Sequence, residues 1–138
     1  MNARTIGYWA TTGLLAFMMF GSGAAKIAGV EDLVKSMEHL GMPLYIMPLL
    51  GAWYIGAGLS LLAPGLARLK EWTYAGIVFA MTGAVFSHLS VGDPLAGSAP
   101  VFVILALAAA SYVLRPNSRR LDTVSASGAV DLQPASAL

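Results

Sequence analysis

The sequence predicts an all-α integral membrane protein, a four-helix bundle with a short amphipathic helix between spans one and two. Three observations favour this fold class. The 138 residues are 57% hydrophobic and only 11% charged, and their mean hydropathy is +0.72, a composition outside the usual range of soluble domains. Four stretches lack any charged residue, and each is long enough to cross about 30 Å of hydrocarbon as a helix. Polar and apolar residues do not alternate with period two, so transmembrane strands are not expected.

The four charge-free stretches give the expected positions of the spans. They cover residues 5–25, 40–67, 72–92 and 94–114. Proline and glycine at positions 64 and 65 end the second span near residue 63. Proline at position 116 ends the fourth near residue 114. We therefore expect one bundle over residues 1–115 and a disordered cytoplasmic tail over residues 116–138.

A shorter segment between spans one and two has a different pattern. Its apolar residues fall at helical spacing and its charges lie on the opposite face, which predicts a helix on the outer membrane surface. Gly41 and Pro43 end it. The apolar positions are Val30, Leu33, Val34, Met37 and Leu40.

The basic residues predict the orientation. Most of them fall on one side of a four-span arrangement, namely Arg4, Arg68, Lys70, Arg115, Arg119 and Arg120. By the positive-inside rule both termini are cytoplasmic and the protein lies in the inner (plasma) membrane as a multi-pass protein. The loops after spans one and three then face outward.

Composition also narrows the function classes. The net charge is only +1, which gives no electrostatic reason to expect a nucleic-acid partner. The absence of cysteine removes disulfides, thiol nucleophiles and cysteine-ligated metal centres. The expected partners are therefore the lipid bilayer, a small apolar or anionic ligand, and another membrane subunit or a second copy of the chain.

Small residues recur every four positions in spans two and three. Ala52, Gly56 and Ser60 form one such stripe, and Gly76 and Ala80 begin another. In lipid, stripes of this kind allow helices to approach closely. We interpret them as packing faces rather than as the walls of a cofactor groove.

Three ionisable residues are expected at one membrane face, Lys26, His88 and Asp93. Such a cluster has the chemistry to bind a small anion, with Asp93 holding the imidazole of His88 while the imidazole moves protons. A plainer interpretation stays open: Lys26 extends to the headgroups, His88 lies in the wet interface, and Asp93 makes a turn with Pro94.

A second group of candidate residues lies deeper. Tyr54 falls near the middle of span two beside Trp53, and its hydroxyl needs a partner such as Ser22 or Thr82. We consider these four as ligand-binding residues, with structural packing as the alternative.

The histidines raise two other possibilities. His39 and His88 invite a haem interpretation, but they belong to different kinds of segment. His88, Asp93 and a glutamate have suitable ligand types for a metal but no diagnostic spacing, so no metal site is predicted.

Five segments in order along the chain resemble the DoxX-like family of small four-helix membrane proteins. The family takes its name from a subunit of an archaeal thiosulfate:quinone oxidoreductase, so the resemblance implies a membrane location and a quinone as the cofactor to consider. The segments are GSGAAKIAG (21–29), LGMPLYIMPLLG (40–51), LKEWTYAG (69–76), TGAVFSHLSVGDP (82–94) and SYVLRPNSRRL (111–121).

The resemblance also bears on individual positions. Lys26, His88, Gly92 and Asp93 match recurrent family positions. Relatives often carry an ionisable residue near the position of Tyr54 and an acidic one at that of Ala80. Both are uncharged here, which puts a deep proton or redox relay in doubt.

Three functions follow as hypotheses. The first is an accessory or ligand-binding subunit of a redox or quinone-linked system, with a pocket opening outward among Lys26, His88 and Asp93 and lined more deeply by Tyr54 and Trp53. The second is a membrane enzyme that isomerises an apolar substrate or opens an epoxide, with His88 as acid or base and Tyr54 as hydrogen-bond donor. The third is a structural interaction protein. The sequence does not identify the ligand.

Overall fold

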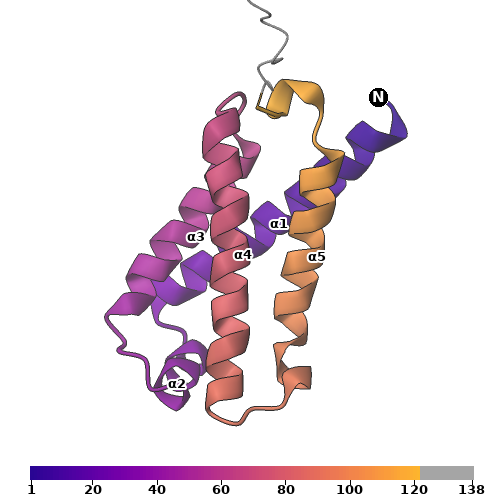
Figure 1. Cartoon of the computed structure of the whole chain (residues 1–138). Helices are drawn as coiled ribbons and strands as arrows, with labels where there is room; N and C mark the ends of the chain where they lie inside the picture. Colours follow the sequence, from indigo (N-terminus) through magenta and orange to yellow (C-terminus); the bar gives the residue numbers. More distant parts are fainter. Residues whose placement is uncertain (122–138) are drawn as a thin grey trace, which may run out of the picture.

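A computed structural model describes residues 1–121, and every element in that range is helical (Figure 1). The all-α class is therefore confirmed for the described part of the chain. The elements are α1 (Ala3–Ala28), α2 (Glu31–His39), α3 (Ile46–Leu62), α4 (Ala67–Ser90), α5 (Ala99–Leu114) and the short 3-10 helices η1 (Leu95–Ser98) and η2 (Asn117–Arg119).

Four long helices run between two chemically different ends. The N-terminus, the α3–α4 connection and η2 lie at one end, and α2 and the α4–α5 connection lie at the other (Figure 1). We call the first the basic end, defined by Arg4, Arg68, Lys70, Arg115, Arg119 and Arg120, and the second the histidine end, defined by His39, His88 and Asp93. Helix α1 packs against α3 and α5, and α4 packs against α5.

Local sequence signals set the boundaries of α1 and α2. The side chain of Asn2 caps the first turn of α1 by accepting from the Thr5 amide at 2.9 Å. Gly29 ends the helix with φ of +65°, a conformation that glycine adopts at little cost. The chain then bends by 83° into α2. Its position between α1 and α3 confirms the short helix predicted there.

Helix α4 begins earlier than the expected third span. It starts at Ala67, so Arg68, Lys70 and Glu71 lie in its first turns rather than in a loop. Lys70 is fully buried there. Its ammonium donates to the carbonyls of Ser60, at 2.8 Å, and Ala63.

The helices differ in their ability to cross a bilayer. Only the segment Leu95–Leu114 is a continuous helical unit both long and apolar enough within the described residues. The bent pair α1 and α2 passes the same criteria together, and Ile46–Leu62 is apolar but shorter. The number of spans therefore stays a prediction.

The core lies where α1, α4 and α5 meet the basic end of α3. It consists of Leu15, Met19, Leu61, Tyr74, Ile77, Met81 and Ala108. Beside it, the buried Ser111 hydroxyl lies 2.6 Å from Thr12 Oγ1 and 2.6 Å from Tyr74 Oη. This hydroxyl cluster links α1, α4 and α5, as interhelical polar contacts do in membrane bundles.

Helices α1 and α3 meet closely at two glycines, Gly23 and Gly51. A Cβ built on Gly23 would lie 2.7 Å from Gly51 O, and one built on Gly51 would lie 2.6 Å from Gly23 O. We call this contact the glycine seam. Gly58 lies in a similar contact, since a Cβ built on it would lie 2.9 Å from the ring of Phe20.

The chain continues past α5 in a short packed segment. Arg119 of η2 donates to the carbonyls of Leu61, at 3.1 Å, and Ala63, at 3.3 Å. Its guanidinium also lies over the Trp9 ring, 4.6 Å from the centroid. The part of the predicted tail from residue 122 onward lies outside the described residues.

Candidate functional site: the groove between α3 and α4

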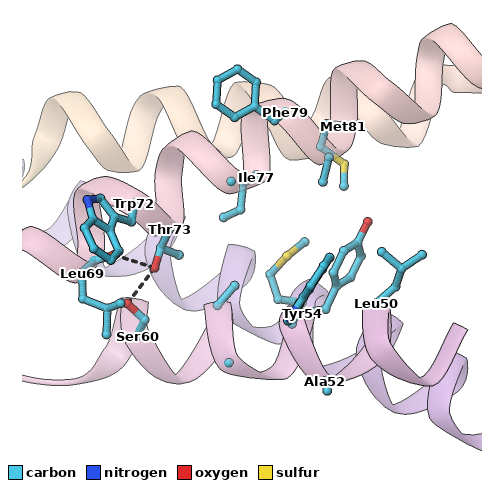
Figure 2. A pocket seen from close by; sticks show the side chains of 16 residues that line it. Leu50, Ala52, Tyr54, Ser60, Leu69, Trp72, Thr73, Ile77, Phe79 and Met81 are labelled. Atoms are coloured by element: carbon cyan, nitrogen blue, oxygen red, sulfur yellow. Dashed lines mark hydrogen bonds between the residues drawn. The ribbon is translucent and has the colours of Figure 1, made fainter. Parts of the chain in front are cut away.

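A partly open groove of about 930 Å³ lies between α3 and α4 (Figure 2). Its wall is almost wholly apolar and includes Met19 of α1. The lining residues are Leu50, Ala52, Trp53, Tyr54, Gly56, Ala57 and Ser60 from α3, and Leu69, Trp72, Thr73, Gly76, Ile77, Phe79, Ala80 and Met81 from α4. A volume of this size suits a drug-sized or cofactor-sized ligand.

The groove exists because its walls are made of small residues. A Cβ built on Gly56 or Gly76 would meet nothing within 4 Å. Ala52, Ser60 and Ala80 from the same stripes also line the space. The interpretation of these stripes as packing faces therefore holds only in part. Ser60 is buried and Ala80 packs against the core, whereas Gly56 and Gly76 face open space in the groove. Helix α3 contacts α1 at the glycine seam instead.

Two hydroxyls form the polar part of the groove toward the basic end. Thr73 Oγ1 donates to Ser60 Oγ at 2.8 Å or to Leu69 O at 2.9 Å (Figure 2). A threonine has one hydroxyl hydrogen, so these bonds alternate. When Thr73 donates to Ser60, the Ser60 hydrogen is left for another acceptor.

Tyr54 supplies the second polar element, and its ring stands up from α3 toward α4 (Figure 2). The ammonium of Lys26 lies over the ring, 4.5 Å from its centroid, and donates to Ser22 Oγ at 2.7 Å. This geometry fits a cation–π contact. Within residues 1–121 Tyr54 has no hydrogen bond to Ser22 or Thr82. Three of the predicted residues, Lys26, Ser22 and Tyr54, are thus brought together at the α1–α3 contact.

The other two predicted ligand-binding residues, Trp53 and Thr82, do not lie with this group. Trp53 lines the groove with 61% of its surface exposed. Thr82 is exposed and donates to Val78 O at 2.8 Å within its own helix. Its hydroxyl is therefore used locally, as threonine hydroxyls in helices often are.

At the histidine end, one carboxylate joins two imidazoles. His88 Nδ1 donates to Asp93 Oδ2 at 2.6 Å, and His39 Nε2 donates to Asp93 Oδ1 at 2.8 Å. The pairing of His88 with Asp93 was expected from the sequence, whereas the bond from His39 was not. Lys26 makes no hydrogen bond or ion pair with either residue in the described structure.

These hydrogen bonds alter the titration of the carboxyl group. The bond from His88, followed by that from His39, lowers the pKa of Asp93 below its ordinary value of 3.8. Because Asp93 accepts from His88 Nδ1, the Nε2 atom of His88 is the acceptor nitrogen when the ring is neutral. Neither His88 nor Asp93 lines the α3–α4 groove.

The histidines and Asp93 are also the residues that were considered for binding a metal or a haem. Among residues 1–121, no group of three or more histidine, aspartate, glutamate or cysteine side chains is arranged to hold a metal ion. Each of the two histidines uses one ring nitrogen in a hydrogen bond to Asp93.

Polar bonds hold α3 and α4 together at the basic end of the groove, and a separate bond at the histidine end joins α2 to the α4–α5 connection. At the basic end, Lys70 of α4 donates to the last carbonyls of α3. At the histidine end, His39 ties α2, which leads into α3, to Asp93 beyond α4. The sequence did not lead us to expect that Lys70 and Arg119 donate hydrogen bonds to the last carbonyls of α3. The signal was present, because Ala63 and Pro64 follow the last residue of α3, so the helix has no glycine cap there and its last carbonyls need other donors.

One of the comparisons with known proteins identifies a family. The sequence profile described as the DoxX-like family matches residues 10–111. This confirms the resemblance drawn from the sequence segments. No curated protein and no solved structure matches the chain.

Proposed function

This chain belongs to the DoxX-like family, and on that premise we propose that it is a multi-pass membrane protein whose α3–α4 groove binds a largely apolar ligand with a hydrogen-bonding head. The observation that carries the proposal is the groove itself. It is large and apolar, it is lined by small and aromatic residues, and its two helices are joined by polar bonds at the basic end.

The exposed surface supports membrane embedding. Large aromatic side chains on α1 and α4 are exposed. Phe17 is 73% exposed, Trp72 70% and Phe79 75%. Only 17% of the Leu95–Leu114 segment is buried within the protein. Apolar surface of this extent is unfavourable in water and favourable in hydrocarbon, so lipid is the environment that suits four long helices.

The distribution of charge supports the orientation. Both the N-terminus and η2 lie at the basic end (Figure 1). The positive-inside rule then makes that end cytoplasmic and the histidine end external, in an inner (plasma) membrane.

The ligand chemistry follows from the lining. Trp53, Trp72 and Phe79 offer aromatic faces for a flat ring or an isoprenoid-like chain, and the Ser60–Thr73 pair can donate one hydrogen bond to a carbonyl or hydroxyl oxygen. A quinone has both features. The described residues include no cysteine, so the role assigned to the chain is to bind and orient such a molecule as an accessory subunit of a redox system.

A second candidate function has its own observation. Asp93 fixes one nitrogen of His88 and leaves Nε2 as a proton acceptor, the arrangement that orients a general base. An enzyme acting on an apolar substrate at the external face would use this dyad. Loss of turnover in H88Q, with ligand content of the groove unchanged, would support this function.

The main proposal is tested by purifying the protein in native lipid and identifying bound molecules by mass spectrometry and absorbance. We expect one apolar ligand class at near-stoichiometric amounts in the wild type. Gly76→Leu places a side chain in the groove and is expected to reduce that ligand at least tenfold. Gly83→Leu is the matched control, because Gly83 also lies on α4 in open space but does not line the groove. Equal ligand in both variants would overturn the proposal.

A further inference from the structure

A second groove, of about 500 Å³, lies between α4 and α5 on another face of α4. Its walls are apolar and include Ala75, Val78 and Phe79 from α4 and Leu105, Ala109 and Val113 from α5. It extends from Glu71, near the basic end, to Phe79 on α4. Eight residues of helix span about 12 Å, which is close to the depth of one leaflet in a hydrocarbon core of about 30 Å.

Charged residues lie at the end of this groove nearest the basic end, which we call its mouth. Arg115 Nη2 lies 2.8 Å from Glu71 Oε1, and its guanidinium lies 4.0 Å from the centroid of the Tyr112 ring. Arg115 is only 3% exposed, and its Nη1 has no hydrogen-bond partner among the described residues. The carboxylate at the mouth is thus already occupied by a buried arginine.

Two more arginines meet at Val113, another residue that lines this groove. Arg4 Nη2 and Arg120 Nη2 both donate to the carbonyl of Val113, at 3.2 Å and 2.9 Å. Each guanidinium has five N–H groups, and Arg4 uses one in the described structure while Arg120 uses two. Three arginines and one glutamate leave a net charge of +2 at the mouth of an apolar groove.

We propose that the α4–α5 groove is a binding site for one anionic phospholipid, with an acyl chain along the groove and the phosphate between Arg4 and Arg120. Charge complementarity carries this choice, because basic groups beside an apolar groove match a negative headgroup above a hydrocarbon chain. The inference rests on the membrane embedding proposed above, and it is independent of the ligand in the α3–α4 groove.

A second copy of the chain is a poorer occupant of this groove. Copies in one membrane share an orientation, so the basic end of one molecule would face the basic end of the other. The described acidic residues other than Glu71 are Glu31, Asp32, Glu38 and Asp93, which belong to α2 or the α4–α5 connection at the opposite end. Like charges placed together oppose association.

The test is native mass spectrometry of the full chain in nanodiscs that contain equal phosphatidylglycerol and phosphatidylcholine. We expect the wild type to retain one phosphatidylglycerol preferentially. The double variant R4Q/R120Q is expected to lose the preference by roughly 25-fold, since each basic group near an anionic membrane surface contributes about a fivefold effect. R68Q is the matched control, because Arg68 is an exposed basic residue of the same end that, within the described structure, makes no hydrogen bond to Val113 or to another residue lining the groove.

The proposed position of the acyl chain in the α4–α5 groove is tested separately. Ala109→Phe fills the groove and is expected to reduce retained phosphatidylglycerol, whereas Ala106→Phe, on the same helix but outside both grooves, leaves it unchanged. Equal loss in R68Q and R4Q/R120Q, or a stable dimer in place of bound lipid, would overturn the phospholipid site. Failure of the wild type to insert into nanodiscs at all would instead overturn the proposed function.

Discussion

Helix α3 has small residues on two sides, and the two sides have opposite surroundings. Toward α1, Gly51 lies so close to Gly23 that an added Cβ would be 2.6 Å from a backbone oxygen. Toward α4, Gly56 faces the groove, where an added Cβ would meet nothing within 4 Å. The same residue type therefore closes one interface and keeps another open.

The difference shows what small residues do in a membrane helix. They permit close approach, but they do not require it, because no hydrophobic effect drives helices together in lipid. At the glycine seam the backbones themselves are in contact. At the groove, polar bonds from Lys70 and Thr73 join α4 to the end of α3, while the rest of the space between the two helices stays open.

The largest expected effect is at the glycine seam. Gly51→Ala forces α1 and α3 apart, because the clash is with backbone rather than with a flexible side chain. We expect a loss of about 3 kcal/mol in the free energy of unfolding, measured by SDS titration in mixed micelles. Gly23→Ala should behave in the same way. Stability equal to the wild type in both variants would show that the seam is not formed.

The next effect concerns the bond that closes the groove at the basic end. Lys70→Met removes two donors from the last carbonyls of α3 and is expected to lower stability by about 2 kcal/mol. Arg68→Met, an exposed change in the same turn, is the control and should have little effect. Equal effects of the two changes in the same titration would contradict the role of Lys70.

Sequence reasoning located the helices well, because their signals are local. Gly29, Gly41 and Pro64 lie at or next to the ends of helices, and the charge-free runs mark their interiors. The His88–Asp93 pair was also predictable, since five residues separate the two positions at the end of one helix.

The parts that could not be predicted depend on how whole helices are rotated and tilted. Whether Gly56 packs or lines a groove is decided by the rotation of α3, which the contact of Gly51 with α1 fixes. His39 reaches Asp93 across 54 positions of sequence because α2 is turned by 83° from α1. Lys26 lies over Tyr54 rather than beside His88 for the same kind of reason.

A smaller, pH-dependent effect is expected at the histidine end. The pKa of Asp93 is lowered in the folded protein, so the stability contributed by its bonds is complete above the ordinary value of 3.8 and is lost as the pH falls below it. Asp93→Asn should remove this dependence, measured as the unfolding midpoint between pH 5 and pH 2.5. Glu38→Gln on α2 should retain it. An unchanged pH profile in Asp93→Asn would contradict the assignment.

The smallest effect has the opposite sign. Gly76→Ala adds a methyl group to open space and replaces a poor helix former with the best one, so we expect a gain of a few tenths to about 1 kcal/mol. The same SDS titration applies, with Gly83→Ala as the comparison. A loss as large as that of Gly51→Ala would mean that the groove is filled by protein rather than open.

The most direct test of the groove as a ligand site is photolabelling in native membranes with a photoreactive benzoquinone analogue, followed by peptide mapping. The account predicts labelled residues between positions 50 and 60 and between positions 69 and 81, and their protection by excess unmodified quinone. Labelling spread evenly over all exposed helical faces, or confined to the segment around His88 and Asp93, would contradict it.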